Sequence, residues 1–101
     1  MEKVILFYLE DCPYCHYAKR AIEELKKENP KYSGIDIEWI EESRYPEVAD
    51  RYNYYYVPTI FYGDKKLYEA SPSEDYVACK NNIRTALDDI KELEKLIEEL
   101  S

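Results

Sequence analysis

Five prolines divide the 101-residue chain into segments and restrict what each segment can form. Proline has a fixed φ and no N–H group, so it suits the first turn of a helix or a connection and disrupts helix interiors and central strands. Pro13, Pro46 and Pro72 each precede a stretch whose apolar residues follow helical spacing, whereas Pro30 ends the first of these stretches. Pro58 precedes a short apolar run. The prolines therefore predict strands and helices joined by short connections.

Four segments have the length and composition of strands. Lys3 to Leu9 is a nearly continuous apolar run, which is typical of a strand covered on both faces. Ile35 to Glu41 alternates between apolar and acidic residues, as expected of a strand near the sheet edge. The third strand is expected over Thr59 to Tyr62, and the hairpin signal Gly63-Asp64 pairs it with Lys65 to Glu69.

The first two helices are expected to be short or of ordinary length. The first begins at Pro13 and ends at Asn29, just before the next proline. The second runs from Pro46 to about Tyr52, and we expect Asn53 to end it in a left-handed conformation.

The last helix is expected from Pro72 to Leu100, because Ser71-Pro72-Ser73-Glu74 resembles a capping box. At ~1.5 Å per residue such a helix would span roughly 43 Å, more than a small domain needs. We therefore expect it to bend near Asn81-Asn82 or to extend past the sheet. The helix carries apolar residues as far as its end, including Val77, Ile97 and Leu100.

The order β-α-β-α-β-β-α predicts an α/β fold, in which a small mixed sheet has helices on both faces. The length suits one domain over residues 1–101. A hydrophobic fraction of 46% can form a core, and the formal net charge of −8 disfavours nucleic acid. No run approaches the ~20 apolar residues of a membrane span, and no signal-peptide pattern is present. We expect a cytoplasmic protein that is a monomer rather than a homodimer.

The motif Cys12-Pro13-Tyr14-Cys15 lies where the first strand meets the first helix. With Cys12 at the N-cap, its sulfur would face the unpaired N–H groups of the first turn, which favour the reactive thiolate. Cys15 falls on the apolar side of the helix and is expected to be shielded. The pair therefore predicts one exposed, activated thiol and one thiol placed to form a disulfide with it.

The cysteines could instead bind a zinc ion or attach a haem group. A zinc site would need further ligands, and only His16 and Cys79 remain, with His16 expected to face solvent. Cys12 to His16 also matches the haem-attachment pattern, which requires an exported protein and a distal ligand. We expect no metal or other bound cofactor, and a buried, structural role for Cys79.

The Cys-Pro-Tyr-Cys motif resembles that of the glutaredoxins, and Tyr56-Val57-Pro58-Thr59 looks like the cis-proline loop of the thioredoxin superfamily. The resemblance extends in order from Met1 to Ala70. It implies a thioredoxin-like fold and a thiol–disulfide oxidoreductase with Cys12 and Cys15 as the catalytic pair. It also implies that Pro58 is cis and lies beside that pair, and that the Val57 backbone holds an extended substrate segment.

Substrate contacts are also expected from the residues between the cysteines, Pro13 and Tyr14, with Tyr14 exposed. The cluster Tyr52, Tyr54, Tyr55 and Tyr56 enters the cis-proline loop, where alternate rings are expected to pack inward. The sequence allows two roles for this cluster: an aromatic rim that contacts a substrate polypeptide, or packing within the fold.

The chain departs from the glutaredoxin pattern in two places where that family holds glutathione carboxylates. Glu10 and Asp11 stand where a basic residue is usual, and residues 69–75 lack the Gly-Gly-x-Asp segment. Leu6 also differs from the buried aspartate of thioredoxins. We therefore expect weak glutathione binding, a protein disulfide as substrate, and a dedicated reductase or glutathione as electron donor. The alternative is a non-catalytic thioredoxin-fold module that binds a partner or handles a metal.

Overall fold

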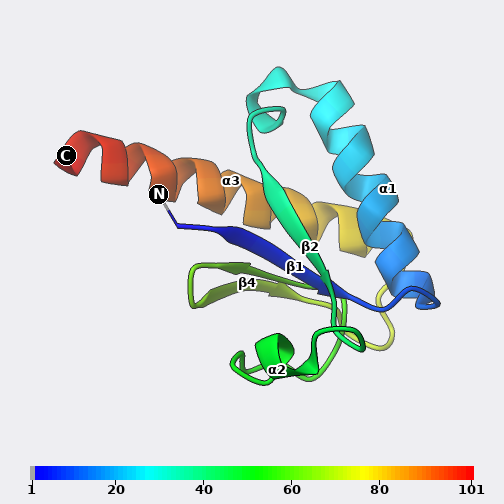
Figure 1. Ribbon diagram of the computed structural model, residues 1–101. Coiled ribbons are helices and arrows are strands. Elements are labelled where there is room, and N and C mark those ends of the chain that lie inside the picture. The colour runs from blue at the N-terminus through cyan, green and yellow to red at the C-terminus, as the bar shows by residue number, and fades with distance from the viewer. Residues whose placement is uncertain (1) are drawn as a thin grey trace.

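A computed structural model describes residues 2–101, and Figure 1 shows its arrangement. It contains four strands, three α-helices and one short 3-10 helix. In chain order they are β1 (Val4–Tyr8), α1 (Pro13–Glu28), η1 (Pro30–Tyr32), β2 (Ile37–Glu41), α2 (Pro46–Ala49), β3 (Thr59–Tyr62), β4 (Lys65–Glu69) and α3 (Tyr76–Leu100). The expected order of strands and helices is confirmed, and the mixed α/β architecture is that of a thioredoxin-like fold.

The four strands form one mixed sheet in the order β2-β1-β3-β4. β1 pairs in parallel with β2 and antiparallel with β3, and β3 pairs antiparallel with β4. The first strand is therefore internal and the second is at an edge, as their sequence patterns indicate. Gly63, with φ of 60°, makes the tight turn between β3 and β4.

The larger part of the core lies between the sheet and the helices α1 and α3, which cover one face (Figure 1). Alternate residues of β1 and β3 point into it, and fully buried side chains of both helices meet them there. The central members with at most 1% exposure are Leu6, Ala18, Ala21, Leu25, Ile60, Cys79, Ile83, Ala86, Leu87 and Ile90. Leu6 is thus an apolar core residue at the position where thioredoxins have a buried aspartate.

The opposite face of the sheet is covered by α2 and the loop that follows it. Phe7 is fully buried there, and its ring stacks on Tyr54 with centroids 5.0 Å apart. Tyr52 packs against the same ring and against Phe61. Two rings of the tyrosine cluster therefore pack inward, while Tyr55 and Tyr56 are exposed, so the expected strict alternation stops at Tyr56.

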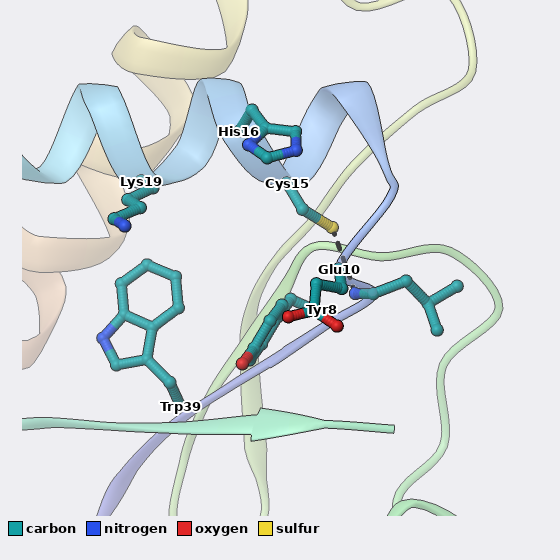
Figure 2. Close-up of a pocket in the computed structure, with 7 residues that line it drawn as sticks. Tyr8, Glu10, Cys15, His16, Lys19 and Trp39 are labelled. Carbon is teal, nitrogen blue, oxygen red and sulfur yellow. Dashed lines mark hydrogen bonds between the residues drawn. The ribbon is translucent and has the colours of Figure 1, made fainter. Parts of the chain in front are cut away.

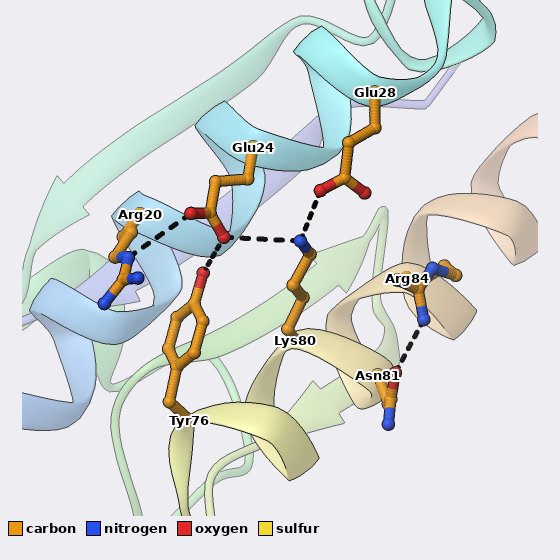
Figure 3. Close-up of polar contacts among 7 residues, drawn as sticks. All are labelled: Arg20, Glu24, Glu28, Tyr76, Lys80, Asn81 and Arg84. Carbon is orange, nitrogen blue, oxygen red and sulfur yellow. Dashed lines mark hydrogen bonds and ion pairs between the residues drawn. The ribbon is translucent and has the colours of Figure 1, made fainter.

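Polar contacts join α1 to α3 along their outer edge (Figure 3). The Tyr76 hydroxyl donates a hydrogen bond to Glu24, and Lys80 Nζ lies 3.3 Å from Glu24 Oε1 and 2.5 Å from Glu28 Oε2. The hydrogen bond from Tyr76 is the largest of several effects that lower the pKa of the Glu24 carboxyl. The guanidinium of Arg20 stacks on the Tyr76 ring, 4.4 Å from its centroid. These contacts fix how the first turn of α3 lies against α1.

The expected start of the last helix is wrong. α3 begins at Tyr76, and Asp75 is its N-cap, with the carboxylate accepting the Ala78 N–H at 2.8 Å. Glu74 is instead buried, where it accepts hydrogen bonds from the Tyr68 hydroxyl at 2.5 Å and from Asn82 Nδ2 at 2.7 Å. Pairing of Glu74 with these two groups moves the helix start from Ser71 to Asp75.

The second helix is also shorter than expected. α2 ends at Ala49, with Asp50 as its C-cap in a right-handed conformation. Asn53 is not left-handed, because no described residue other than glycine has a positive φ. The Asp50 N–H instead donates back to the carbonyl groups of Pro46 and Val48.

α3 runs without interruption through Asn81 and Asn82, so it extends past the sheet and does not break there (Figure 1). Ile97 and Leu100 at its far end are 37% and 88% exposed, and Val77 is 66% exposed. Ile97 and Leu100 lie at the end of α3 that extends past the sheet. Val77 is exposed for a different reason, because it points away from α1 in a turn whose neighbours Tyr76 and Lys80 contact that helix.

No helix within residues 2–101 combines the length and the apolar composition that crossing a membrane requires.

The two glycines of the chain give a paired test of the hairpin. Gly63→Ala places a Cβ at positive φ and 2.6 Å from Glu2 Oε2, so we expect it to lower the free energy of unfolding by about 1–2 kcal/mol. Gly34→Ala meets no atom within 4 Å and is the control, expected to be neutral or to stabilise by up to ~1 kcal/mol. Urea denaturation of both variants measures the difference, and equal effects would contradict the turn geometry.

Candidate redox site

The junction of β1 and α1 determines where the first cysteine lies. β1 ends at Tyr8, and Pro13 is the first residue of α1, which leaves Cys12 as the N-cap. Its carbonyl oxygen accepts the N–H groups of Cys15 and His16, which begins the helix. Its sulfur makes no hydrogen bond to the first turn, contrary to expectation, and lies 3.7 Å from the Val57 carbonyl oxygen. Cys12 is partly exposed and its thiol is free.

Cys15 lies one turn further along α1 and is 5% exposed, so the expected shielding is confirmed. Its sulfur accepts the Leu9 N–H at 3.5 Å, which ties it to the end of β1. Burial raises the pKa of the Cys15 thiol to about 12, against the Leu9 hydrogen bond, which lowers it. Contact with Cys12 and the charge of Glu42 raise it further. Cys15 is therefore a protonated thiol at neutral pH.

The loop before β3 brings the backbone of Val57 to the cysteines. The Val57-Pro58 peptide bond is cis, as the resemblance implies, and Pro58 is buried. One oxygen of the Glu69 carboxylate, from β4, accepts the N–H groups of Tyr55 at 2.5 Å and Tyr56 at 2.8 Å. Burial would raise the pKa of this carboxyl, but the ammonium group of Lys66 and the two N–H groups hold it below the usual value. An ionised Glu69 thus holds the loop against β4.

Tyr14, between the cysteines, is half-buried, which corrects the expectation that it is exposed. Its hydroxyl donates to the Pro72 carbonyl oxygen at 2.5 Å, and its ring meets Tyr17 edge to face. The bond joins the cysteine motif to the connection before α3. Pro13 is exposed beside it.

Two acidic residues directly precede Cys12 in the loop between β1 and α1. Glu10 and Asp11 are exposed, and Arg44 forms an ion pair of 3.1 Å with Glu10. Such a surface pair is weak, so it reduces the negative charge beside the cysteine only in part. Arg44 was not expected at this site from the sequence, because it lies 34 positions from Glu10 along the chain.

Glu41 is a second residue that was not expected at this site from the sequence. It is 7% exposed at the end of β2, and its carboxylate accepts hydrogen bonds from Ser43 and from the Glu10 N–H at 3.4 Å. The Ser43 hydroxyl, more than any other group, keeps the pKa of this carboxyl below its usual value. Glu41 therefore anchors the loop that carries Cys12. The sequence did contain an indication that Glu41 is buried, because alternation along β2 places Glu41 on the same inward side as Ile35 and Ile37.

A cavity of about 470 Å³ opens between α1 and the β1–β2 edge (Figure 2). It reaches Cys15, and His16 lines it as an exposed residue, as expected of a solvated histidine. The other lining residues are Tyr8, Leu9, Glu10, Lys19 and Trp39. The sequence did not indicate this cavity, because its walls come from three separate elements.

Cys79 is 1% exposed, in contact with the Tyr68 hydroxyl at 3.5 Å, so its burial is confirmed. Within residues 2–101, no group of three or more His, Cys, Asp or Glu residues is placed to hold a metal ion.

Comparison with known proteins relates the chain to a protein family and to a thioredoxin. The sequence profile of the glutaredoxin family matches residues 4–67, from β1 into β4. The chain is also similar to a thioredoxin from Methanocaldococcus jannaschii, with 32% identity over 73 residues, which are 72% of this chain and 84% of that protein. The family match includes the cysteine motif and the loop with the cis peptide bond.

The burial of the thiols predicts their reactivity with iodoacetamide. In the reduced, native protein at pH 7 we expect Cys12 to be alkylated and Cys15 and Cys79 to remain free. With a pKa of about 12, only about one Cys15 in 100,000 is thiolate at that pH. Peptide mass spectrometry measures the labelling, with the urea-unfolded protein as control, in which all three react. Similar labelling of Cys12 and Cys15 in the native protein would contradict the assignment.

Proposed function

Because this chain belongs to the glutaredoxin family, we propose that it reduces disulfide bonds in other proteins through Cys12 and Cys15. Thiol–disulfide oxidoreductase chemistry in general is what the family and the thioredoxin relative support. One observation carries the specific proposal. The N-cap residue of α1 carries a partly exposed thiol beside the Val57 carbonyl group, and a buried second thiol follows one turn further along the helix.

In the proposed reaction the Cys12 thiolate attacks one sulfur of the substrate disulfide. A Cys12–substrate disulfide forms, and the other substrate sulfur leaves as a thiolate that takes up a proton. Cys15 then loses its proton and attacks Cys12 Sγ, which forms the Cys12–Cys15 disulfide and releases the second substrate thiolate. Two electrons and two protons pass from the protein dithiol to the substrate.

The resting state of Cys15 suits this order of events. Burial is the main cause of the raised pKa of Cys15 and persists through the reaction, and the negative charge of a Cys12 thiolate raises this pKa further until Cys12 is joined to substrate. Cys15 therefore becomes easier to deprotonate only after the first step. The Val57 backbone and the exposed Pro13, Tyr55 and Tyr56 would contact the substrate, whereas Tyr14 supports the motif through Pro72.

Three single substitutions test the two cysteine roles. Cys12→Ser is expected to abolish reduction of a protein disulfide such as that of insulin, because no thiol remains at the exposed position. Cys15→Ser is expected to accumulate a disulfide between Cys12 and the substrate, visible by non-reducing electrophoresis. Cys79→Ala is the matched control, which removes a buried thiol outside the site and retains turnover. Full multiple turnover by Cys15→Ser would contradict the assigned order, and inactivity of the native protein would support the non-catalytic alternative.

The charges around Cys12 predict poor use of glutathione, which is an anion. Glu10→Gln with Asp11→Asn is expected to raise the rate of glutathione-coupled disulfide reduction severalfold, because two repulsive carboxylates are lost. The control is Glu98→Gln with Glu99→Gln, which removes two adjacent carboxylates at the far end of α3 and makes the same change in net charge. The gain should shrink as salt concentration rises. Native turnover equal to that of an ordinary glutaredoxin would contradict this prediction.

A further inference from the structure

A pocket of about 390 Å³ lies where α2 meets the loop that leads to the cis peptide bond (Figure 1). This volume is at the lower end of the range for ligand pockets, so it suits a small group. The pocket shares no lining residue with the cavity that reaches Cys15. It is lined by two carboxylates and three tyrosine rings, which belong to Glu42, Asp50, Tyr52, Tyr54 and Tyr55.

The tyrosine wall of the pocket is held in place by the fold. Tyr54 stacks on Phe7, with ring centroids 5.0 Å apart, and its hydroxyl donates to the Glu42 carboxylate at 2.7 Å. Burial, above all, raises the pKa of the Tyr54 hydroxyl, and the hydrogen bond to Glu42 and the charges of Glu42 and Asp50 raise it further. Both carboxylates therefore act on the same ring. Tyr55 is 86% exposed, so its ring can cover a group that enters the pocket.

The negative charge of this pocket is not neutralised by cations of the chain itself. Within residues 2–101, no ion pair engages Glu42 or Asp50. Arg51 follows Asp50 in the sequence but lines a different pocket, which Phe61 also lines. The faces of tyrosine rings attract cations as well. The carboxylates and rings together select a cation, and a planar guanidinium group suits both because it pairs with carboxylates and stacks on rings.

The pocket is close to the sulfur that attacks the substrate. Tyr55 stands two residues before Val57, whose carbonyl oxygen lies 3.7 Å from Cys12 Sγ. Two residues of extended chain span about 7 Å. The charge of Glu42 also reaches the cysteines, because it adds to the burial that raises the pKa of Cys15. A substrate segment held at the Val57 backbone would therefore pass within reach of the pocket.

We propose that this pocket binds the cationic side chain of an arginine or lysine located about two residues from the attacked cysteine of the protein substrate. The inference rests on the proposed function and names its substrate class, which is disulfide proteins that are basic around that cysteine. Backbone pairing at Val57 does not distinguish one sequence from another, so the pocket supplies a preference that the backbone cannot. The tyrosine cluster then both packs against the sheet and lines the substrate site.

The pocket changes the affinity for the substrate and leaves the chemical steps as they are. Cys12 attacks the substrate disulfide and Cys15 closes the protein disulfide, with the same two electrons transferred to the substrate. The negative charge that repels glutathione, which is an anion, attracts a basic polypeptide to the same site. Because the contact is exposed, it provides a preference and not a requirement.

Peptides that contain arginine or citrulline test the pocket, because citrulline has the shape of arginine without its charge. Each peptide has one cysteine, is joined to a copy of itself by a disulfide, and carries the test residue two positions before and two positions after the cysteine. We expect the pre-reduced native protein to reduce the arginine peptide about fivefold faster in single turnover, as one exposed ion pair and one cation–π contact allow. Acid quench and chromatography of the peptide thiol give the second-order rate constants. Equal rates for the two peptides overturn the proposal.

Two controls separate the pocket from general attraction of a cation. Each rate constant is divided by that of dithiothreitol with the same peptide, which removes differences between the disulfides themselves. In a second pair of peptides the test residue lies eight positions from the cysteine, about 26 Å along an extended chain, and at physiological salt the ratio is expected to fall below about twofold. The same ratio for near and far positions overturns the proposal.

Removal of the two carboxylates tests the residues named. Glu42→Gln with Asp50→Asn is expected to lower the ratio for the near peptides below about twofold, because the charge is lost while an amide oxygen can still accept the Tyr54 hydroxyl. Loss of the Glu42 charge also affects Cys15, but it affects both peptides alike, so the ratio reports the pocket. An unchanged ratio overturns the proposal.

Two further variants complete this comparison. Glu98→Gln with Glu99→Gln, at the far end of α3, makes the same change in net charge and should retain the ratio. Tyr55→Ala removes an exposed ring and should lower the ratio about twofold with the fold intact. A fall in the α3 control as large as in the pocket variant overturns the proposal.

The same assay separates this proposal from the proposed function. Failure of the pre-reduced protein to reduce any of the peptides, all of which dithiothreitol reduces, refutes the proposed function. Reduction of arginine and citrulline peptides at equal rates refutes the cation pocket alone.

Discussion

Burial of β1 on both faces of the sheet is the constraint on which the rest of the structure depends. Leu6 packs beneath α1 and α3, Phe7 packs beneath the tyrosines of the other face, and both are fully buried. The strand is internal, so its direction and register are fixed by β2 and β3. Because Pro13 starts the helix only a few residues later, Cys12 has little freedom in where it can lie. A large part of the core thus holds one thiol in place.

Local signals in the sequence predicted the order of elements and the places of Cys12 and Cys15 at the start of α1, whereas the cis Val57-Pro58 loop was expected only from the family resemblance. The start of α3 was not predictable in that way, because the capping-box pattern indicated Ser71 whereas the N-cap is Asp75. The choice between them depends on burial of Glu74, a contact made across the fold with Tyr68 and Asn82. Short-range patterns carry no information about such a contact.

The surroundings of the cysteines also depend mostly on contacts between residues that are far apart in the sequence. Tyr14 is less exposed than expected because its hydroxyl bonds to the carbonyl oxygen of Pro72, which is 58 positions away. The cavity beside Cys15 is lined by Lys19 of α1 and Trp39 of β2, which are also distant in sequence. These pairings depend on how α1 lies across the sheet, so they emerge only from the assembled structure. Glu41 was the exception, since strand alternation alone indicates that its carboxylate points inward.

The carboxylate of Glu69 has one more consequence, which concerns how selective the protein can be. It occupies the N–H groups of Tyr55 and Tyr56, so these two residues have no amide hydrogens to offer an incoming strand. For a substrate bound as proposed, backbone pairing on this side begins only at Val57. Such a short stretch of backbone pairing contacts peptide groups that all sequences share, and it contacts few substrate side chains. Breadth of substrate choice would then follow from a single acidic residue on a neighbouring strand.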